Sequence, residues 1–79
     1  MKLLVRNLAR SITEQELRVL FSKHGSVTLC NLVLDQETGQ SKGFAFVEMP
    51  DDAEANKAMR ELNMTTIDKS KIRVRVADK

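Results

Sequence analysis

Cysteine, proline, glycine and aromatic residues are all scarce in this chain. Its 79 residues include one cysteine, one proline, three glycines and three phenylalanines, with no tryptophan or tyrosine. It has no low-complexity tract or internal repeat, and 42% apolar with 30% charged residues argues against a collagen-like, coiled-coil or disordered chain. A chain this short can bury one core, so we expect a single domain over residues 1–79.

The single cysteine, Cys30, cannot form a disulfide within the chain, which indicates a reducing compartment: the cytoplasm, or the nucleus of a eukaryote. We expect its thiol to be a small, buried apolar group. The apolar run Leu3–Val5 ends at Arg6 and is too short for a secretory signal or a membrane span. We therefore expect no targeting segment and no membrane partner, and we expect the domain to be the whole protein.

Few residues are suited to catalysis or metal binding. The one histidine, His24, ends a predicted helix, where a cation interacts favourably with the helix dipole, and it has no evident metal-ligating partner. Asp51 and Asp52 mark a helix start, and Gly39 and Gly43 are too isolated to form a phosphate-binding loop. We expect no enzyme activity, no metal, no cofactor and no small-molecule substrate.

Hydrophobic periodicity predicts four strands, the second and third being joined by the turn residues Asp35–Gly39. The strands are expected at residues 2–6, 27–34, 44–49 and 71–76.

Capping residues predict a helix after the first strand and another after the third. Thr13 and Glu16 form a capping box that starts one helix at Glu14, and we expect Gly25 to end it in a left-handed cap. Asp51 caps the other helix. The order βαββαβ predicts an α+β, ferredoxin-like fold, with an antiparallel sheet of strand order 4-1-3-2 and both helices on one face.

The third predicted strand decides which side chains lie on the open face of the sheet. Phe44, Phe46 and Glu48 share one face of this strand, and the alternate residues share the other. Burying the two phenylalanines would also bury an unpaired carboxylate, which is strongly unfavourable. We therefore predict that both rings face away from the helices.

Most of the positive charge is predicted to lie on the same open face, although the whole chain carries only +2. Leu4 is placed there because its neighbours two residues away on the strand are cations, which cannot lie beneath helices. The cations are Lys2, Arg6, Lys42, Arg73 and Arg75. Exposed rings among cations suit single-stranded nucleic acid, because bases stack on rings and phosphates pair with lysine and arginine.

Two segments resemble the sequence motifs of one family. Lys42–Met49 (KGFAFVEM) resembles the RNP1 motif of the RNA recognition motif (RRM), and Leu3–Leu8 (LLVRNL) resembles its RNP2 motif. The resemblance covers nearly the whole chain. It implies a domain that binds single-stranded RNA, in which Phe46 stacks under a base, Phe44 packs against sugars and Lys42 pairs with a phosphate.

The chain departs from the family at several positions. Leu4 and Met49 stand where aromatic residues are usual, and Met64 and Lys69 stand where glycines are frequent. Leucine offers no ring, so the second base site should be weak and the affinity modest, with a loss of about tenfold to hundredfold for one missing ring. The loop between the second helix and the last strand is expected to differ in shape.

The predicted RNA-binding residues are Lys2, Leu4, Arg6, Asn31, Val33, Lys42, Phe44, Phe46, Glu48, Arg73 and Arg75. Whether Asn31 and Val33 touch bases or only complete the sheet is left open by the sequence. Arg73 and Arg75 could also act as charges that protect an edge strand from aggregation. Single-stranded DNA is an alternative ligand.

Two other functions are compatible with the same fold. A protein-binding RRM could cover Leu4 and Val33 with a partner or a second copy, although Thr65–Ile67 stands where peptide-binding relatives carry an Arg-x-Phe feature. A small enzyme similar to the acylphosphatases would need a glycine-rich phosphate loop and a nucleophile with a base, and the sequence has neither.

Overall fold

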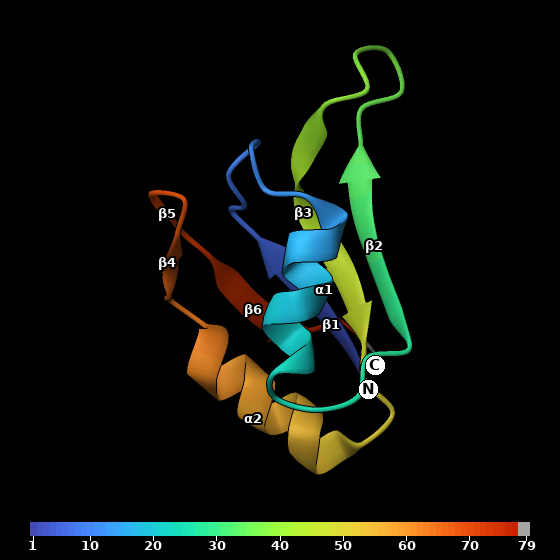
Figure 1. The fold of residues 1–79 in the computed structure, drawn as a ribbon, viewed down its shortest axis with the longest axis vertical. Coiled ribbons are helices and arrows are strands. Elements are labelled where there is room, and N and C mark those ends of the chain that lie inside the picture. Colours follow the sequence, from blue (N-terminus) through green and yellow to red (C-terminus); the bar gives the residue numbers. More distant parts are fainter. Residues whose placement is uncertain (78–79) are drawn as a thin grey trace.

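Two helices cover one face of a four-stranded antiparallel sheet, as Figure 1 shows. The computed structural model describes residues 1–77, so the last two residues of the predicted domain, 78 and 79, lie outside the described residues. The elements are β1 (Lys2–Arg6), α1 (Glu14–Ser22), β2 (Leu29–Leu34), β3 (Ser41–Glu48), α2 (Asp52–Leu62), β4 (Thr66–Ile67), β5 (Ser70–Lys71) and β6 (Arg73–Val76). The sheet order β2-β3-β1-β6 confirms the predicted ferredoxin-like topology.

The core lies between the helices and the sheet. Leu3 and Val5 of β1, with Leu17 and Phe21 of α1, have no exposed surface. The other buried apolar residues are Leu8, Ile12, Cys30, Ala45, Val47, Met49, Ala55, Ala58, Leu62, Ile72 and Val74. Because these residues alternate along the strands, the sheet has one covered face and one open face.

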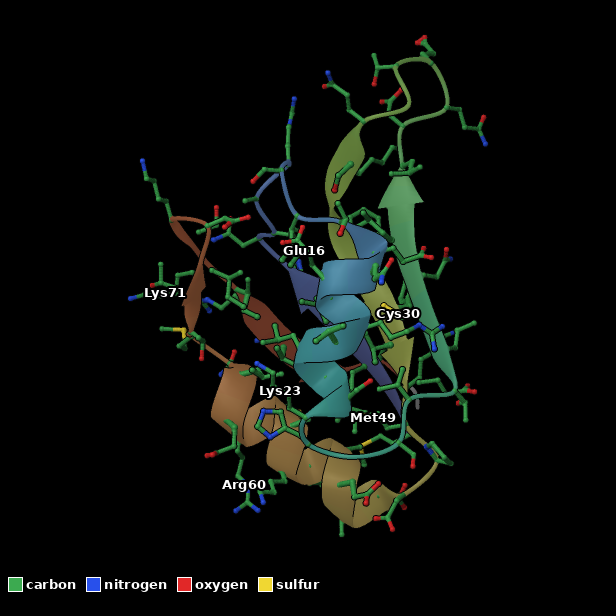
Figure 2. The ribbon with its side chains drawn as sticks, viewed as in Figure 1. Glu16, Lys23, Cys30, Met49, Arg60 and Lys71 are labelled. Carbon is green, nitrogen blue, oxygen red and sulfur yellow. The ribbon has the colours of Figure 1, made fainter. Side chains whose placement is uncertain are left out.

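Cys30 is one of the buried residues and is a free thiol, as predicted. Its Sγ lies 3.6 Å from the backbone carbonyl of Glu14 on α1, on the helix side of the sheet (Figure 2). Burial, reinforced by the charge of Glu14, raises the pKa of the Cys30 thiol, so it stays protonated near neutral pH. No helix among the described residues is long and apolar enough to cross a membrane.

Both helices start where their capping residues predict. The Thr13 hydroxyl accepts from the Glu16 N–H at 3.1 Å, and the Glu16 carboxylate accepts from the Thr13 N–H at 3.1 Å. At the second helix, the Asp51 carboxylate accepts from the Glu54 N–H at 3.0 Å. Each cap satisfies backbone N–H groups that have no partner within the helix.

The predicted left-handed cap at Gly25 is wrong. Helix α1 ends with Lys23 in a right-handed conformation, and Gly25 has a φ of +157°, outside the left-handed helical range. Glycine is favoured here for two other reasons: residues with a side chain rarely adopt this φ, and a Cβ would lie only 2.6 Å from the Cβ of Glu54 on α2. The Glu54 carboxylate also accepts from the Ser26 N–H at 3.1 Å, so this loop is held by a helix distant in sequence.

The last predicted strand is divided, which corrects the boundary at residue 71. Lys71 pairs with Thr66 in the β4–β5 hairpin, which the sequence did not predict, and the main sheet takes only Arg73–Val76. Met64 and Lys69, which replace frequent glycines, have φ values of 68° and 70°. The backbone therefore keeps a glycine-like conformation at both positions, with side chains that this conformation disfavours.

Replacing Lys69 with glycine is expected to raise the free energy of unfolding by about 0.5 to 1 kcal/mol, because it removes the left-handed strain and offsets the entropy that glycine adds to the unfolded chain. Urea denaturation followed by circular dichroism measures this change. Lys57→Gly on the exposed side of α2 is the matched control, and it should lower stability by about 1 kcal/mol. A loss of stability in Lys69→Gly would contradict the strain at this position.

At each edge of the main sheet, a side-chain oxygen accepts a hydrogen bond from a backbone N–H group of the edge strand. On β2 the Leu32 N–H donates to the Glu14 carboxylate at 3.0 Å. On β6 the Val74 N–H donates to the Asn63 side-chain oxygen at 3.0 Å. Each edge strand thus has one N–H group that is unavailable for pairing with a further strand.

Candidate nucleic-acid interface

Four side chains form one row across the open face of the sheet. Leu4 of β1 is paired with Phe46 of β3 on one side and with Arg75 of β6 on the other. Phe46 is paired in turn with Asn31 of β2. Directly paired residues of antiparallel strands project from the same face, so this row joins all four strands.

The orientation of β3 agrees with the prediction. Phe44 and Phe46 are half-buried and Glu48 is exposed, as expected for the face that carries no helix. The alternate residues are fully buried: Ala45, Val47 and Met49. Two of the three phenylalanines therefore lie outside the core, where packing of the fold alone does not require them.

The two rings on β3 are perpendicular. Their centroids are 6.1 Å apart and the angle between the ring planes is 89°. This edge-to-face arrangement is a favourable one for an aromatic pair. Because the rings are perpendicular, Phe44 and Phe46 cannot both lie parallel to the same base, so they offer a nucleotide two different kinds of contact.

Lys2 covers the ring of Phe46. Its ammonium lies 5.2 Å from the ring centroid, which is a cation–π contact. Lys2 is paired in register with Glu48, but these two residues form no ion pair; the one ion pair within residues 1–77 joins the N-terminus to Asp52 at 3.8 Å. Glu48 instead accepts weakly from the Thr28 hydroxyl, at 3.4 Å.

Three arginines line a cleft beside the row. Arg6 is paired directly with Arg73, and together with Arg75 and Asn7 they surround a volume of about 410 Å³. None of these arginines has an acidic partner among the described residues. Like charges facing each other across strands destabilise a sheet, so this cluster favours an anionic ligand over a purely structural role. Asn7, which was not among the predicted RNA-binding residues, donates its side-chain N–H to the Lys71 carbonyl at 2.7 Å.

A second cleft, of about 440 Å³, lies at the other end of β3. It is lined by Arg10, Asp35, Thr38, Gln40, Ser41, Lys42 and Phe44. Lys42 is exposed and lines this cleft together with Phe44. Arg10 and Gln40 were not among the predicted residues. The one sequence signal for them is their position in loops that flank the two motif strands.

The β2–β3 turn has a defined shape. The Asp35 carboxylate accepts from the N–H groups of Glu37 and Thr38, at 2.8 Å and 3.2 Å, and the Asp35 carbonyl accepts from the Gly39 N–H at 2.8 Å. The hydrogen bonds from Glu37 and then Thr38 lower the pKa of Asp35, so the carboxylate is ionised at neutral pH. Asp35 and Thr38 of this turn line the second cleft together with Lys42.

The remaining predicted residues lie on β2, at the edge of the sheet. Asn31 is exposed and Val33 is half-buried. Residues 1–77 contain no group of three or more histidine, cysteine, aspartate or glutamate side chains that could hold a metal ion. The candidate site is therefore a surface of rings and cations.

Comparison with known proteins points to one family. The model of the RNA recognition motif family matches residues 3–73. The chain is 42% identical over 74 residues to the chloroplastic 28 kDa ribonucleoprotein of Spinacia oleracea, which covers 94% of this chain and 32% of that protein. More generally, the chain spans 24% to 32% of the length of the chloroplast ribonucleoproteins that it matches.

Two solved structures have the same fold. The crystal structure of RNA Binding Protein PG1 has a TM-score of 0.94 and 35% identity, and the match covers 100% of this chain and 96% of that one. The Sxl-lethal protein/RNA complex has a TM-score of 0.93 and 31% identity, and the match covers 99% of this chain and 47% of that one.

Proposed function

This chain belongs to the RNA recognition motif family, and on that premise we propose that it binds single-stranded RNA on the open face of its sheet. The family is one of binding domains, so the activity is recognition and not catalysis. The observation that carries the proposal is the position of Phe46, a ring on the helix-free face of the sheet, within a row that ends in Arg75 and Asn31.

A base that stacks on Phe46 displaces Lys2 from the ring. An exposed cation–π contact is worth about 0.5 to 1 kcal/mol, whereas a base stacked on an aromatic ring contributes about 1 to 3 kcal/mol. Stacking therefore prevails, and the released ammonium of Lys2 becomes available to a phosphate of the bound strand. Asn31, next to Phe46 in the row, offers both a donor and an acceptor to the edge of that base.

The neighbouring groups bind the rest of the nucleotide chain. Phe44, perpendicular to Phe46, packs against the sugars. Arg6 and Arg73, which face each other without an acidic partner among residues 1–77, hold phosphates at one end of the surface, and Lys42 holds one at the other end. With leucine at residue 4, we expect the affinity to be modest.

Replacing Lys42 with glutamine is expected to lower affinity about equally for all RNA sequences. A phosphate contact carries no base information, and its loss should reduce the slope of log K against log salt by about 0.7, the increment for one phosphate of a single strand. Fluorescence anisotropy titrations at several salt concentrations measure this slope, with Lys57→Gln on α2 as the control. A loss confined to particular sequences would contradict a phosphate role for Lys42.

NMR titration of the chain with randomised short RNA and DNA oligomers tests the proposal as a whole. We expect chemical-shift changes concentrated at Phe44, Phe46 and their neighbours on the open face. These changes should be larger with whichever of RNA and DNA binds more tightly. Absence of shifts with both oligomers, or shifts confined to the helical face, would contradict the proposal.

The unpaired cations on the open face favour RNA over a protein partner, because they would be costly to bury against an apolar surface. A stable dimer in sedimentation experiments would support the protein-binding alternative instead.

We further propose that residues 1–79 act as one domain in a reducing compartment such as the cytoplasm, since Cys30 is a buried free thiol. The spinach relative is chloroplastic.

A further inference from the structure

The row on the open face contains an aromatic ring on β3 but none on β1. Leu4 lies between Phe46 and Arg75, and each of the three is paired directly with its neighbour in the row. We propose that the planar guanidinium of Arg75 stacks on a second base above Leu4 and so replaces the ring that this position lacks. This inference rests on the proposed function and assigns a second base subsite to the same surface.

The register brings Arg75 to the required position. Directly paired residues on antiparallel strands have Cβ atoms about 4.5 to 5.5 Å apart, so the long arginine side chain can extend alongside Leu4. Leu4 is half-buried and forms an apolar floor, whereas Arg75 is exposed. A base above Leu4 would then contact the leucine side chain with one part of its face and the guanidinium plane of Arg75 with the adjacent part.

Arg75 is also free to bind. Within residues 1–77 its side chain has no ion-pair partner, and it lines the cleft of about 410 Å³ together with Arg6 and Arg73. A guanidinium is planar and weakly hydrated, and it stacks on bases as aromatic rings do. Lysine carries the same charge without the plane, so the two residues are not equivalent at a stacking position.

The other two arginines of the cleft are suited to a different task. Arg73 is paired with Arg6 across β1 and β6, whereas Arg75 is paired with the apolar Leu4. Two facing guanidinium groups suit a phosphate, because each supplies several donors to its oxygens. The cleft thus combines a stacking group at Arg75 with phosphate ligands at Arg6 and Arg73, which is the set of contacts one nucleotide requires.

The substitution Arg75→Lys separates stacking from charge. Two probes are used: a labelled RNA octamer of randomised sequence, and an abasic ribose–phosphate octamer that carries the same phosphates. We expect Arg75→Lys to weaken binding of the RNA by about tenfold, with an unchanged salt slope, and to leave binding of the abasic chain essentially unchanged. Arg60→Lys, on the outer side of α2 (Figure 2), controls for the loss of any guanidinium.

A second variant tests whether Arg75 replaces a ring at Leu4. In a Leu4→Phe background, Arg75→Lys is expected to cost about twofold or less, because the new ring then supports the base. Equal losses with both probes, or no loss with either, would overturn the stacking role while leaving RNA binding intact. If the unmodified chain binds no RNA, the proposed function fails and this inference fails with it. Circular dichroism verifies that each variant is folded.

Discussion

Replacing Phe46 with alanine is expected to weaken binding of single-stranded RNA by about 1 to 3 kcal/mol, the contribution of one base stacked on an aromatic ring. The ring is half-buried at the centre of the open face, and its loss also removes the contacts with Lys2 and Phe44. Fluorescence anisotropy titration with a labelled RNA oligomer measures the change in dissociation constant. Because the side chain lies outside the core, the fold should be retained.

Two controls make this result specific. Phe46→Tyr keeps a ring for stacking and should bind RNA nearly as well as the unmodified chain. Val19→Ala truncates an exposed apolar side chain on α1, where Val19 is 52% exposed, and should leave RNA binding unchanged. Equal titration midpoints for Phe46→Ala and the unmodified chain would rule out base stacking at Phe46.

Introducing a phenylalanine at Leu4 is expected to strengthen RNA binding by about tenfold, because a ring then lies beside Phe46 at the second base position. The new ring should not destabilise the sheet, since an aromatic pair across strands contributes about 0.2 to 1 kcal/mol. The same anisotropy titration measures the gain, and urea denaturation measures stability.

Val19→Phe is the matched control, because it adds an exposed ring on the helical side of the molecule. A similar gain in both variants would indicate nonspecific attraction to aromatic surface. Unchanged or weaker binding by Leu4→Phe would show that the position beside Phe46 does not accept a base.

The orientation of the sheet could be predicted because one charged residue decided it. Glu48 cannot be buried without a partner, so Phe44 and Phe46 had to lie on the open face, and the structure has them there. Helix starts were equally predictable, since the bonds of Thr13 and Asp51 join residues three apart in the sequence. These features depend on local patterns.

Features that depend on contacts between distant segments were missed. A side chain at residue 25 would collide with Glu54, which is 29 residues further along the chain, so no local rule could identify this requirement for glycine. Asn7 is anchored by the carbonyl of Lys71, in a hairpin that was not predicted. The position of Lys2 over Phe46, rather than beside Glu48, is a choice between two partners on the same face, and the sequence pattern favours neither.

The side chains of Glu14 and Asn63, which accept hydrogen bonds from the two edge strands, affect how another polypeptide could pair with this sheet. A bare edge strand invites an extended chain to join it and widen the sheet, and this is a common start of aggregation. Here an incoming chain would first have to displace the carboxylate of Glu14 from Leu32, or the amide of Asn63 from Val74. One N–H group on each flank is thereby closed to lateral growth, and the broad surface of rings and guanidinium groups is left as the face without such protection.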